Sequence, residues 1–273
     1  MLVAGKGSHP SGHVVSRSPG TGHNPGTGHN GVMDQATAGF RAFAHRGGAR
    51  EAPENSLAAF THAADLGFIH LETDVRPTRD GVAVLHHDAT LDRTTDGRGA
   101  VRTRTWHDIR AVRMEDGSTL LRLEELLEAL PHAHVTIDAK EAGSVVALVE
   151  AVRRCHASDR VCVTSFSARR LQRARRLLPP GTESSAHPWE VLALRALPRD
   201  PTLPRVHRVQ VPVRSLGITL VEPGFIARAH RLGLAVDVWT VDDPLEMRRL
   251  LALGVDGIMT DSPSVLRGVL TGD

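Results

Sequence analysis

From residue 41 onward, short β-rich runs alternate with amphipathic, helix-prone stretches along almost the whole chain. A strand followed by a helix and then by another strand favours a parallel sheet with helical crossovers. Eight such units in roughly 235 residues match the size of a TIM (β/α)8 barrel, which is the predicted fold. The eight runs are residues 41–45, 68–75, 134–140, 160–166, 183–187, 205–211, 234–241 and 257–261.

The weakest of these runs is "ESSAH" at 183–187, because four prolines crowd the segment that follows it. An open, doubly wound sheet is therefore the alternative architecture. No glycine-rich dinucleotide fingerprint follows the first run, which disfavours the nucleotide-binding form of that alternative.

The first 37 residues have a different composition, rich in Gly, Ser, His and Pro, and "PGTGHN" occurs twice in tandem at 19–24 and 25–30. Such a segment has too little apolar surface to offset the entropy lost on ordering. The sequence therefore predicts a disordered tail over 1–37 and a single folded domain over 38–273.

A ninth β-rich run, "GVAVLHHD" at 81–88, comes directly after the turn-like "RPTRDG". Parallel neighbours need a long crossover and none is available here, so a hairpin excursion after the second strand is expected. Folding about Asp80-Gly81 pairs residues whose numbers add to about 161. That register would set His87 opposite Asp74.

Acidic side chains gather near the predicted ends of the second and third strands, where a barrel carries its chemistry. Glu72 with Asp74, and Asp138 with Lys140, are i,i+2 pairs, so each pair shares one face of its strand. Three buried carboxylates require a positive counter-charge. An all-oxygen set suits one Mg²⁺ or Ca²⁺ ion far better than zinc.

Two histidines, His45 and His87, would flank such an ion as an acid–base pair near neutral pH. Arg46 and Lys140 would neutralise an anionic substrate, Arg as a fork and Lys as a point charge. Lys140 stands out because it is the only Lys in the predicted folded region, whose other permanently charged basic residues are all Arg.

The residues around these groups have simpler expected roles. Gly47 and Gly48 would let the substrate approach, and Glu54 would begin a helix or brace Arg46. Asp261, at the end of the eighth run, would order the last loop. Asn55 is the expected N-cap of the first helix. Trp239, at the end of the seventh run, is assigned to substrate binding.

Six motifs together resemble the glycerophosphodiester phosphodiesterase family over about residues 41–267. They are "AHRG", "APENSLAAF", "LETDVRPTRDGVAVLHHDATLDRTTDG", "TIDAK", "VWTVDDP" and "GVDGIMTD". The resemblance implies a TIM barrel and metal-dependent hydrolysis of glycerophosphodiesters to sn-glycerol 3-phosphate and an alcohol. It departs from the family in Asp138, where the family usually has Glu, and in Asp242, where the family has Asn.

The resemblance also implies a role for each matching position. The acid–base residues are His45 and His87, the phosphate ligands Arg46 and Lys140, and the metal ligands Glu72, Asp74 and Asp138. The nucleophile, water or the substrate's own 2-hydroxyl, is left open, as is which histidine is the base.

Two other functions are compatible with the sequence. The same site could release the headgroup of lysophospholipids, but the aromatic content of 3% offers no obvious apolar groove for an acyl chain. The barrel could also bind a phosphorylated ligand without catalysis. The net charge of +2 gives no reason to expect nucleic acid as a partner. No run approaches the length of a membrane span, so a cytoplasmic enzyme with a small-molecule substrate is expected.

Overall fold

A computed structural model describes residues 39–203, 205–215 and 217–272. Eight parallel strands form its sheet in the order β6-β5-β4-β2-β1-β11-β10-β7. A parallel bridge between Ser185 and Arg208 joins the two outermost strands, so the sheet closes on itself as a barrel. The predicted barrel is therefore confirmed against the open-sheet alternative, whereas the predicted tail lies outside the described residues. The eight strands are β1 (Arg41–His45), β2 (His70–Pro77), β4 (His134–Ala139), β5 (Val161–Thr164), β6 (Glu183–Ser184), β7 (Arg208–Pro212), β10 (Ala235–Trp239) and β11 (Gly257–Thr260).

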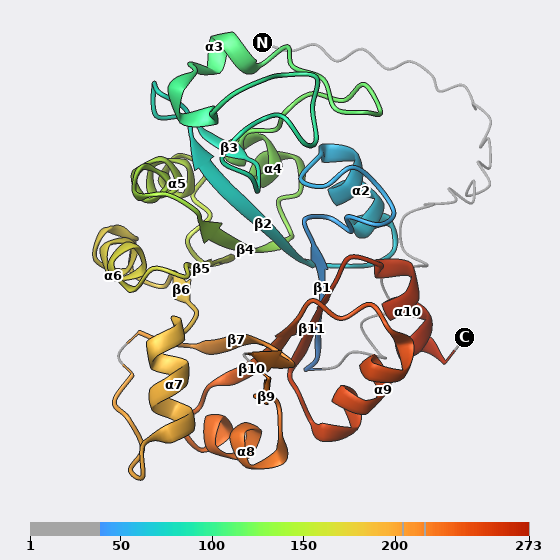
Figure 1. The fold of residues 1–273 in the computed structure, drawn as a ribbon, viewed down its shortest axis with the longest axis vertical. Helices are drawn as coiled ribbons and strands as arrows, with labels where there is room; N and C mark the ends of the chain where they lie inside the picture. The colour runs from blue at the N-terminus through green and yellow to red at the C-terminus, as the bar shows by residue number, and fades with distance from the viewer. Residues whose placement is uncertain (1–38, 204, 216, 273) are drawn as a thin grey trace, which may run out of the picture.

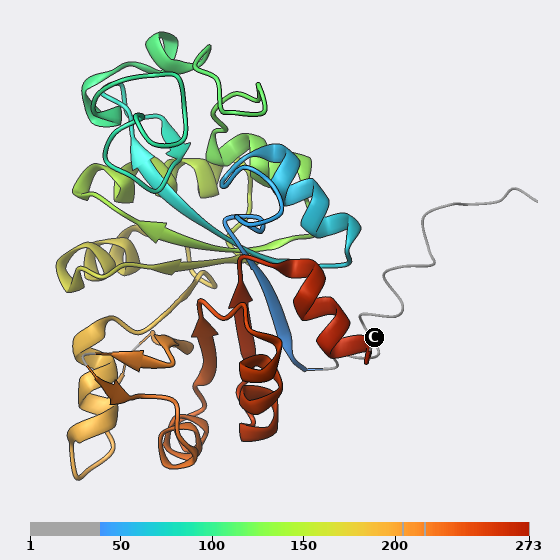
Figure 2. The ribbon, with the colours of Figure 1, turned by 45° about the vertical axis from the view of Figure 1, so that its right-hand side comes forward.

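Helices cover the outside of the barrel, as Figures 1 and 2 show. Each turns a few apolar side chains towards the sheet, among them Phe60, Leu148, Leu171 and Met247, all of which are fully buried. The core is one continuous apolar cluster between helices and strands. The principal helices are α2 (Leu57–Asp65), α4 (Leu123–Ala129), α5 (Ala142–Arg154), α6 (Ala168–Leu177), α7 (Pro188–Ala196), α8 (Pro223–Arg231), α9 (Pro244–Leu253) and α10 (Pro263–Thr271).

The hairpin excursion is present, since β3 (Ala83–Leu85) pairs antiparallel with the end of β2. The predicted register is wrong by one residue: the backbone N–H of His86, not His87, donates to Asp74 at 3.0 Å. Thr78 pairs with Val82, so three residues form the turn where two were expected. Gly81 supplies the positive φ of +83° that such a turn requires.

The chain after β3 packs on a small apolar cluster of its own. This segment includes η1 (Val101–Thr103) and α3 (Trp106–Ile109) and lies beyond the end of β2 in Figure 1. Its buried cluster gives a rigid support to the loop that follows His87. The members of the cluster are Val84, Leu91, Val101, Ile109, Met114 and Leu120.

Two minor strands, β8 (Arg214–Ser215) and β9 (Ile218–Thr219), form a separate hairpin between β7 and α8. Side chains of this hairpin and of α7 line the same cavity. Together they form one wall of the cavity at the carboxyl ends of the strands.

Candidate active site

A cavity of about 550 Å³ lies at the carboxyl ends of the barrel strands. Every residue that the sequence assigned to the site lines it, although they come from five different strands and loops. These residues are His45, Arg46, Glu72, Asp74, His87, Asp138, Lys140 and Trp239.

Lys140 lies between two buried carboxylates. Its Nζ is 2.8 Å from Oδ1 of Asp74 and 2.7 Å from Oδ2 of Asp138. Strands β2 and β4 place the two aspartates directly opposite each other in the parallel register. Burial raises the pKa of Asp74, but Lys140 and Arg46 lower it more, so this carboxyl titrates below its usual range. The ammonium is thus bound to protein oxygens that the sequence assigned to a metal.

Among the described residues, no three Asp, Glu, His or Cys side chains are grouped closely enough to hold a metal ion. The chemistry of the donors nevertheless fits a hard cation. Oδ1 of Asp138 is buried without a hydrogen-bond partner. Burial and the charge of Asp74 also raise the pKa of Glu72 well above its ordinary value. Both observations describe an oxygen set that is short of positive charge.

His45 is held between two carboxylates. Its Nδ1 lies 2.7 Å from Oδ1 of Asp261, and its Nε2 lies 3.6 Å from Oε2 of Glu72. Burial lowers the pKa of His45, but Glu72 and Asp261 raise it more, so the net shift is upward. Asp261 therefore contacts an imidazole, a closer role than the ordering of the last loop that the sequence suggested.

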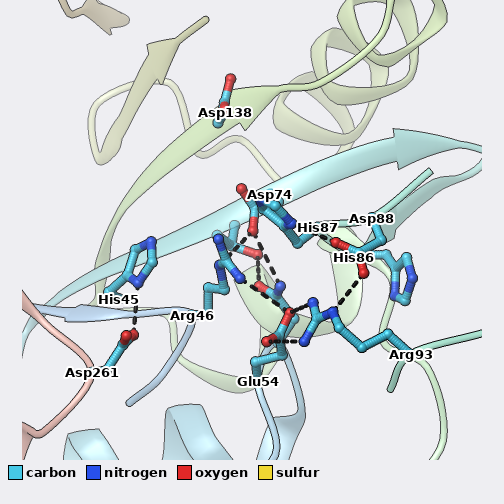
Figure 3. Close-up of polar contacts among 12 residues, drawn as sticks. His45, Arg46, Glu54, Asp74, His86, His87, Asp88, Arg93, Asp138 and Asp261 are labelled. Carbon is cyan, nitrogen blue, oxygen red and sulfur yellow. Dashed lines mark hydrogen bonds and ion pairs between the residues drawn. The ribbon is translucent and has the colours of Figure 1, made fainter. Parts of the chain in front are cut away.

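His87 has a carboxylate partner of its own, because its Nδ1 lies 2.7 Å from Oδ1 of the adjacent Asp88. Its neighbour His86 is buried and bonds the carbonyl oxygen of Thr90 at 2.9 Å instead. Figure 3 shows the two rings in different surroundings. Although His86, not His87, lies opposite Asp74 in the hairpin, it is His87 that lines the cavity. Sequence reasoning missed Asp88, although its position directly after a candidate catalytic histidine was a usable signal.

Arg46 follows β1 in a left-handed conformation, with φ of +52°. Its Nε lies 3.0 Å from Oδ2 of Asp74 and its Nη1 3.2 Å from Oε1 of Glu54. The predicted brace from Glu54 is therefore present. A backbone conformation of this kind is uncommon for a residue with a side chain, and such residues cluster at functional sites.

Gly47 and Gly48 have a packing role that differs from the one the sequence suggested. A Cβ on Gly47 would lie 2.7 Å from the Cβ of Ala59, and one on Gly48 would lie 2.7 Å from the ring of Pro263. Both glycines also have positive φ. They let the β1–α2 loop pack closely against α2 and the start of α10, and do not face the cavity.

The prediction that Asn55 is the N-cap of α2 is wrong. Ser56 is the N-cap, and its hydroxyl accepts from the backbone N–H of Ala59. Asn55 is itself buried with φ of +60°. Its Oδ1 accepts from Thr73, and its Nδ2 donates to Asp74 at 3.4 Å. It is therefore a further partner of the central aspartate, one that the sequence did not indicate.

Asp242, which departs from the family pattern, supports the end of β11. Its Oδ1 accepts from the hydroxyl of Thr260 at 2.9 Å and from the backbone N–H of Asp261 at 2.8 Å. An Asn oxygen could accept the same two hydrogen bonds. The substitution therefore preserves the support of the loop that carries Asp261.

One wall of the cavity is apolar. Phe166, which is 61% exposed, meets Trp239 edge to face at 5.8 Å between ring centroids. Leu192 on α7 and Ile218 on β9 line the same cavity and are also largely exposed. The expectation that the chain offers no obvious apolar groove is therefore wrong. The two aromatic rings are joined there by aliphatic side chains of α7 and the β8–β9 hairpin, which an aromatic count does not reveal.

Over the part of the chain that the structure describes, no helix is both long and apolar enough to cross a membrane.

Comparison with known proteins agrees with this geometry. Residues 45–265 match the glycerophosphoryl diester phosphodiesterase family. A probable glycerophosphodiester phosphodiesterase 2 of Mycobacterium tuberculosis is 42% identical over 237 residues, covering 84% of this chain and 90% of that protein. A mouse lysophospholipase D is 28% identical over 270 residues, covering 84% of this chain and 86% of that protein. The crystal structure of a glycerophosphodiester phosphodiesterase from Agrobacterium tumefaciens aligns with a TM-score of 0.72 at 26% identity, covering 84% of this chain and 99% of that one.

A closed parallel barrel with acidic and basic side chains converging at its carboxyl end is the architecture of a TIM-barrel enzyme. The family model matches most of the chain, residues 45–265, and so identifies which family of TIM-barrel enzymes this is. This chain belongs to the glycerophosphoryl diester phosphodiesterase family, and is an enzyme of the phosphodiester hydrolase class.

Proposed function

We propose that this chain hydrolyses glycerophosphodiesters to sn-glycerol 3-phosphate and an alcohol, with His45 and His87 as its acid–base pair. The observation that carries the proposal is that two imidazoles in one cavity each have a carboxylate at Nδ1, Asp261 and Asp88 respectively. An ionised carboxylate only accepts hydrogen bonds, so each Nδ1 carries the proton. Each Nε2 is then the atom left to exchange a proton with a reacting group.

The proton movements balance across the two rings. One imidazole accepts the proton of the attacking hydroxyl, from water or from the substrate's own glycerol, as the P–O bond forms. The other, protonated beforehand, donates a proton to the leaving alkoxide as its P–O bond breaks. Arg46 and Lys140 neutralise the phosphate charge and orient the diester between the rings.

Glu72, Asp74 and Asp138 would hold the divalent cation, Mg²⁺ or Ca²⁺, whose binding their hard oxygens favour. When bound, the cation would add positive charge beside the phosphoryl oxygens. The unpartnered Oδ1 of Asp138 and the raised pKa of Glu72 support this assignment.

The test is hydrolysis of glycerophosphocholine by the full chain in the presence of Mg²⁺ or Ca²⁺, with sn-glycerol 3-phosphate as the measured product. Release of that product at a rate proportional to enzyme supports the proposal. Release of phosphocholine in its place would show that the other ester bond is cleaved. No turnover with either cation would leave a barrel that only binds phosphorylated ligands.

The apolar wall supports a second candidate, hydrolysis of lysophospholipids by the same site. Phe166, Leu192 and Ile218 offer a surface that an acyl chain could cover, next to the groups that would hold the phosphate. This activity has a precedent in the name of the mouse relative. The discriminating measurement is the ratio of kcat/KM for a short-chain, monomeric lysophosphatidylcholine to that for glycerophosphocholine.

Leu192→Asp should lower that ratio, because it places a charge where the acyl chain would lie. Leu245→Asp is the matched control, since Leu245 is equally apolar, 71% exposed and outside the cavity lining. A ratio that neither variant changes would count against lysophospholipids as substrates and leave glycerophosphodiesters as the proposed substrate class.

A further inference from the structure

Arg93 lies in the loop after β3 and contacts two carboxylates that come from different parts of the chain. Its Nε lies 2.5 Å from Oδ2 of Asp88. Its Nη1 and Nη2 lie 2.9 and 2.7 Å from the two oxygens of Glu54, which belongs to the β1–α2 loop. All three guanidinium nitrogens are therefore engaged, in the fork geometry that favours Arg over Lys.

Each of those carboxylates is bound in turn to a residue of the proposed site. Asp88 binds Nδ1 of His87, and Glu54 binds Nη1 of Arg46. Figure 3 shows the result as a continuous chain of hydrogen bonds and ion pairs with Arg93 at its centre. One side chain thus connects a proposed acid–base group to a proposed phosphate ligand.

We infer that Arg93 is a positioning residue, which fixes the imidazole of His87 through Asp88. The inference rests on the proposed function, because it assigns Arg93 to the same reaction. Its contact with Glu54 ties the loop that carries it to the loop that carries Arg46. No direct contact between Arg93 and the substrate is required.

The two halves of this chain of contacts depend on Arg93 to different degrees. Arg46 has a second anchor in Asp74, at 3.0 Å. The carboxylate of Asp88, by contrast, contacts only the side chains of His87 and Arg93 in this way among the described residues. Because 29% of it is exposed, Asp88 can turn towards solvent once Arg93 is removed. The geometry of His87 is therefore the more sensitive of the two.

The stability contribution of Arg93 should be small, because its side chain is half exposed and such ion pairs contribute little to folding. Catalysis is more demanding, since a displacement of ~1 Å can cost ~10²-fold in rate. The Leu91 side chain, buried two residues earlier, keeps the backbone of the loop in place when Arg93 is replaced. A loss of rate without a loss of stability is thus the signature of a positioning role.

The expected result for Arg93→Ala is a fall in kcat on glycerophosphocholine of ~10- to 100-fold, with KM changed less than kcat. Millimolar guanidinium should restore part of the rate, because the site is open to solvent, and sodium at the same ionic strength should not. Arg98→Ala is the matched control: Arg98 lies in the same loop, is exposed and, among the described residues, donates only to backbone carbonyl oxygens. It should keep the parent kcat.

Asp88→Ala, alone and combined with Arg93→Ala in a double variant, shows whether Arg93 acts through Asp88 or lowers the rate independently of it. If Arg93 acts through Asp88, the double variant should be no slower than Asp88→Ala alone. Multiplicative losses in the double variant would overturn the inference, and so would a parent kcat in Arg93→Ala.

A readout independent of turnover keeps a failure of this inference distinct from a failure of the proposed function. The ¹⁵N–¹H signal of the His87 Nδ1 proton, assigned by its absence in His87→Gln, should be visible in the parent protein. It should broaden in Arg93→Ala and persist in Arg98→Ala. An unchanged signal in Arg93→Ala would show that Arg93 does not fix the ring, whatever reaction the protein catalyses.

Discussion

The carboxylate of Asp261 lies 2.7 Å from Nδ1 of His45, although 216 positions separate the two residues in the sequence. Strand β1 pairs with β11 in parallel, so the loops after the first and last strands meet and bring the pair together. The contact therefore joins the loop after the first strand of the barrel to the loop after the last one. It selects the tautomer of His45 whose Nε2 is free to face Glu72 and the cavity.

Asp261→Ala should therefore lower turnover by ~10- to 100-fold, as the loss of a residue that orients a reactive ring does. The turnover of Asp261→Asn should fall less, because the amide oxygen can still accept a hydrogen bond from the Nδ1–H of His45. Asp65→Asn, an exposed carboxylate on α2, is the control for a change of charge alone. Equal rates for Asp261→Ala and the parent would remove the contact from the mechanism.

Lys140 provides a prediction about both stability and rate. Lys140→Met leaves Asp74 and Asp138 buried without their shared ammonium and should cost about 3–5 kcal/mol of unfolding free energy. Lys140→Arg keeps the charge, but a planar guanidinium cannot occupy the same point between the two carboxylates. It should lose most of the activity while unfolding in urea nearer to the parent than Lys140→Met does. A parent rate in Lys140→Arg would show that the compact ammonium is not needed.

The architecture was predictable because a barrel repeats one local pattern eight times. Each run at 41–45, 134–140 and 257–261 has an apolar interior and ends in polar residues, and the structure places a strand at each. The hairpin register was not predictable from the turn residues alone. It depends on Thr78, whose hydroxyl accepts from the backbone N–H of Val82 and lengthens the turn by one residue.

The residues proposed to touch the substrate and those proposed to position them differ in how visible they are in a sequence. His45, Arg46 and Lys140 are reactive or charged groups at strand ends, and the structure brings them together. Asp261 and Asn55 act through contacts formed only when distant loops meet, so no local pattern marks them. The apolar wall depends likewise on α7 and a short hairpin that are brought together by the closed barrel.

Cation binding should be measurable without turnover. Mg²⁺ or Ca²⁺ at a hundredfold excess over its Kd should raise the unfolding free energy by about 2.7 kcal/mol. Asp138→Ala should remove that gain, and Asp138→Glu should retain it or change the preferred ion. Excess chelator should abolish hydrolysis in the parent protein. Stability and activity that are both indifferent to the cation would contradict the assignment of Glu72, Asp74 and Asp138.

His70, at the opposite end of β2 from the site, gives a prediction for the pH dependence of stability. Burial, with the nearby charges of His134 and Arg41, lowers its pKa from an ordinary value of 6.5 to about 3. Below pH 6.5 the unfolded chain gains a proton that the folded protein does not accept until about pH 3. The stability contributed by the neutral ring is therefore lost as the pH falls through this window, by up to about 1.4 kcal/mol per pH unit.

Replacing His70 by Phe should flatten the decline of unfolding free energy between these pH values, measured by urea titration. The same replacement at exposed His107 should leave the decline unchanged. A slope that is the same in His70→Phe and the parent would show that His70 is not the group that titrates.

The most direct test of acid–base catalysis by His45 and His87 compares two substrates with different leaving groups. His45→Ala and His87→Ala should each lower turnover of glycerophosphocholine by ~10²-fold or more, because its alkoxide must be protonated as it leaves. On a glycerophospho-p-nitrophenyl ester, whose phenolate leaves without a proton, one variant should recover most of its rate, and that residue is the acid. A parent rate on glycerophosphocholine in either variant would contradict the proposed pair.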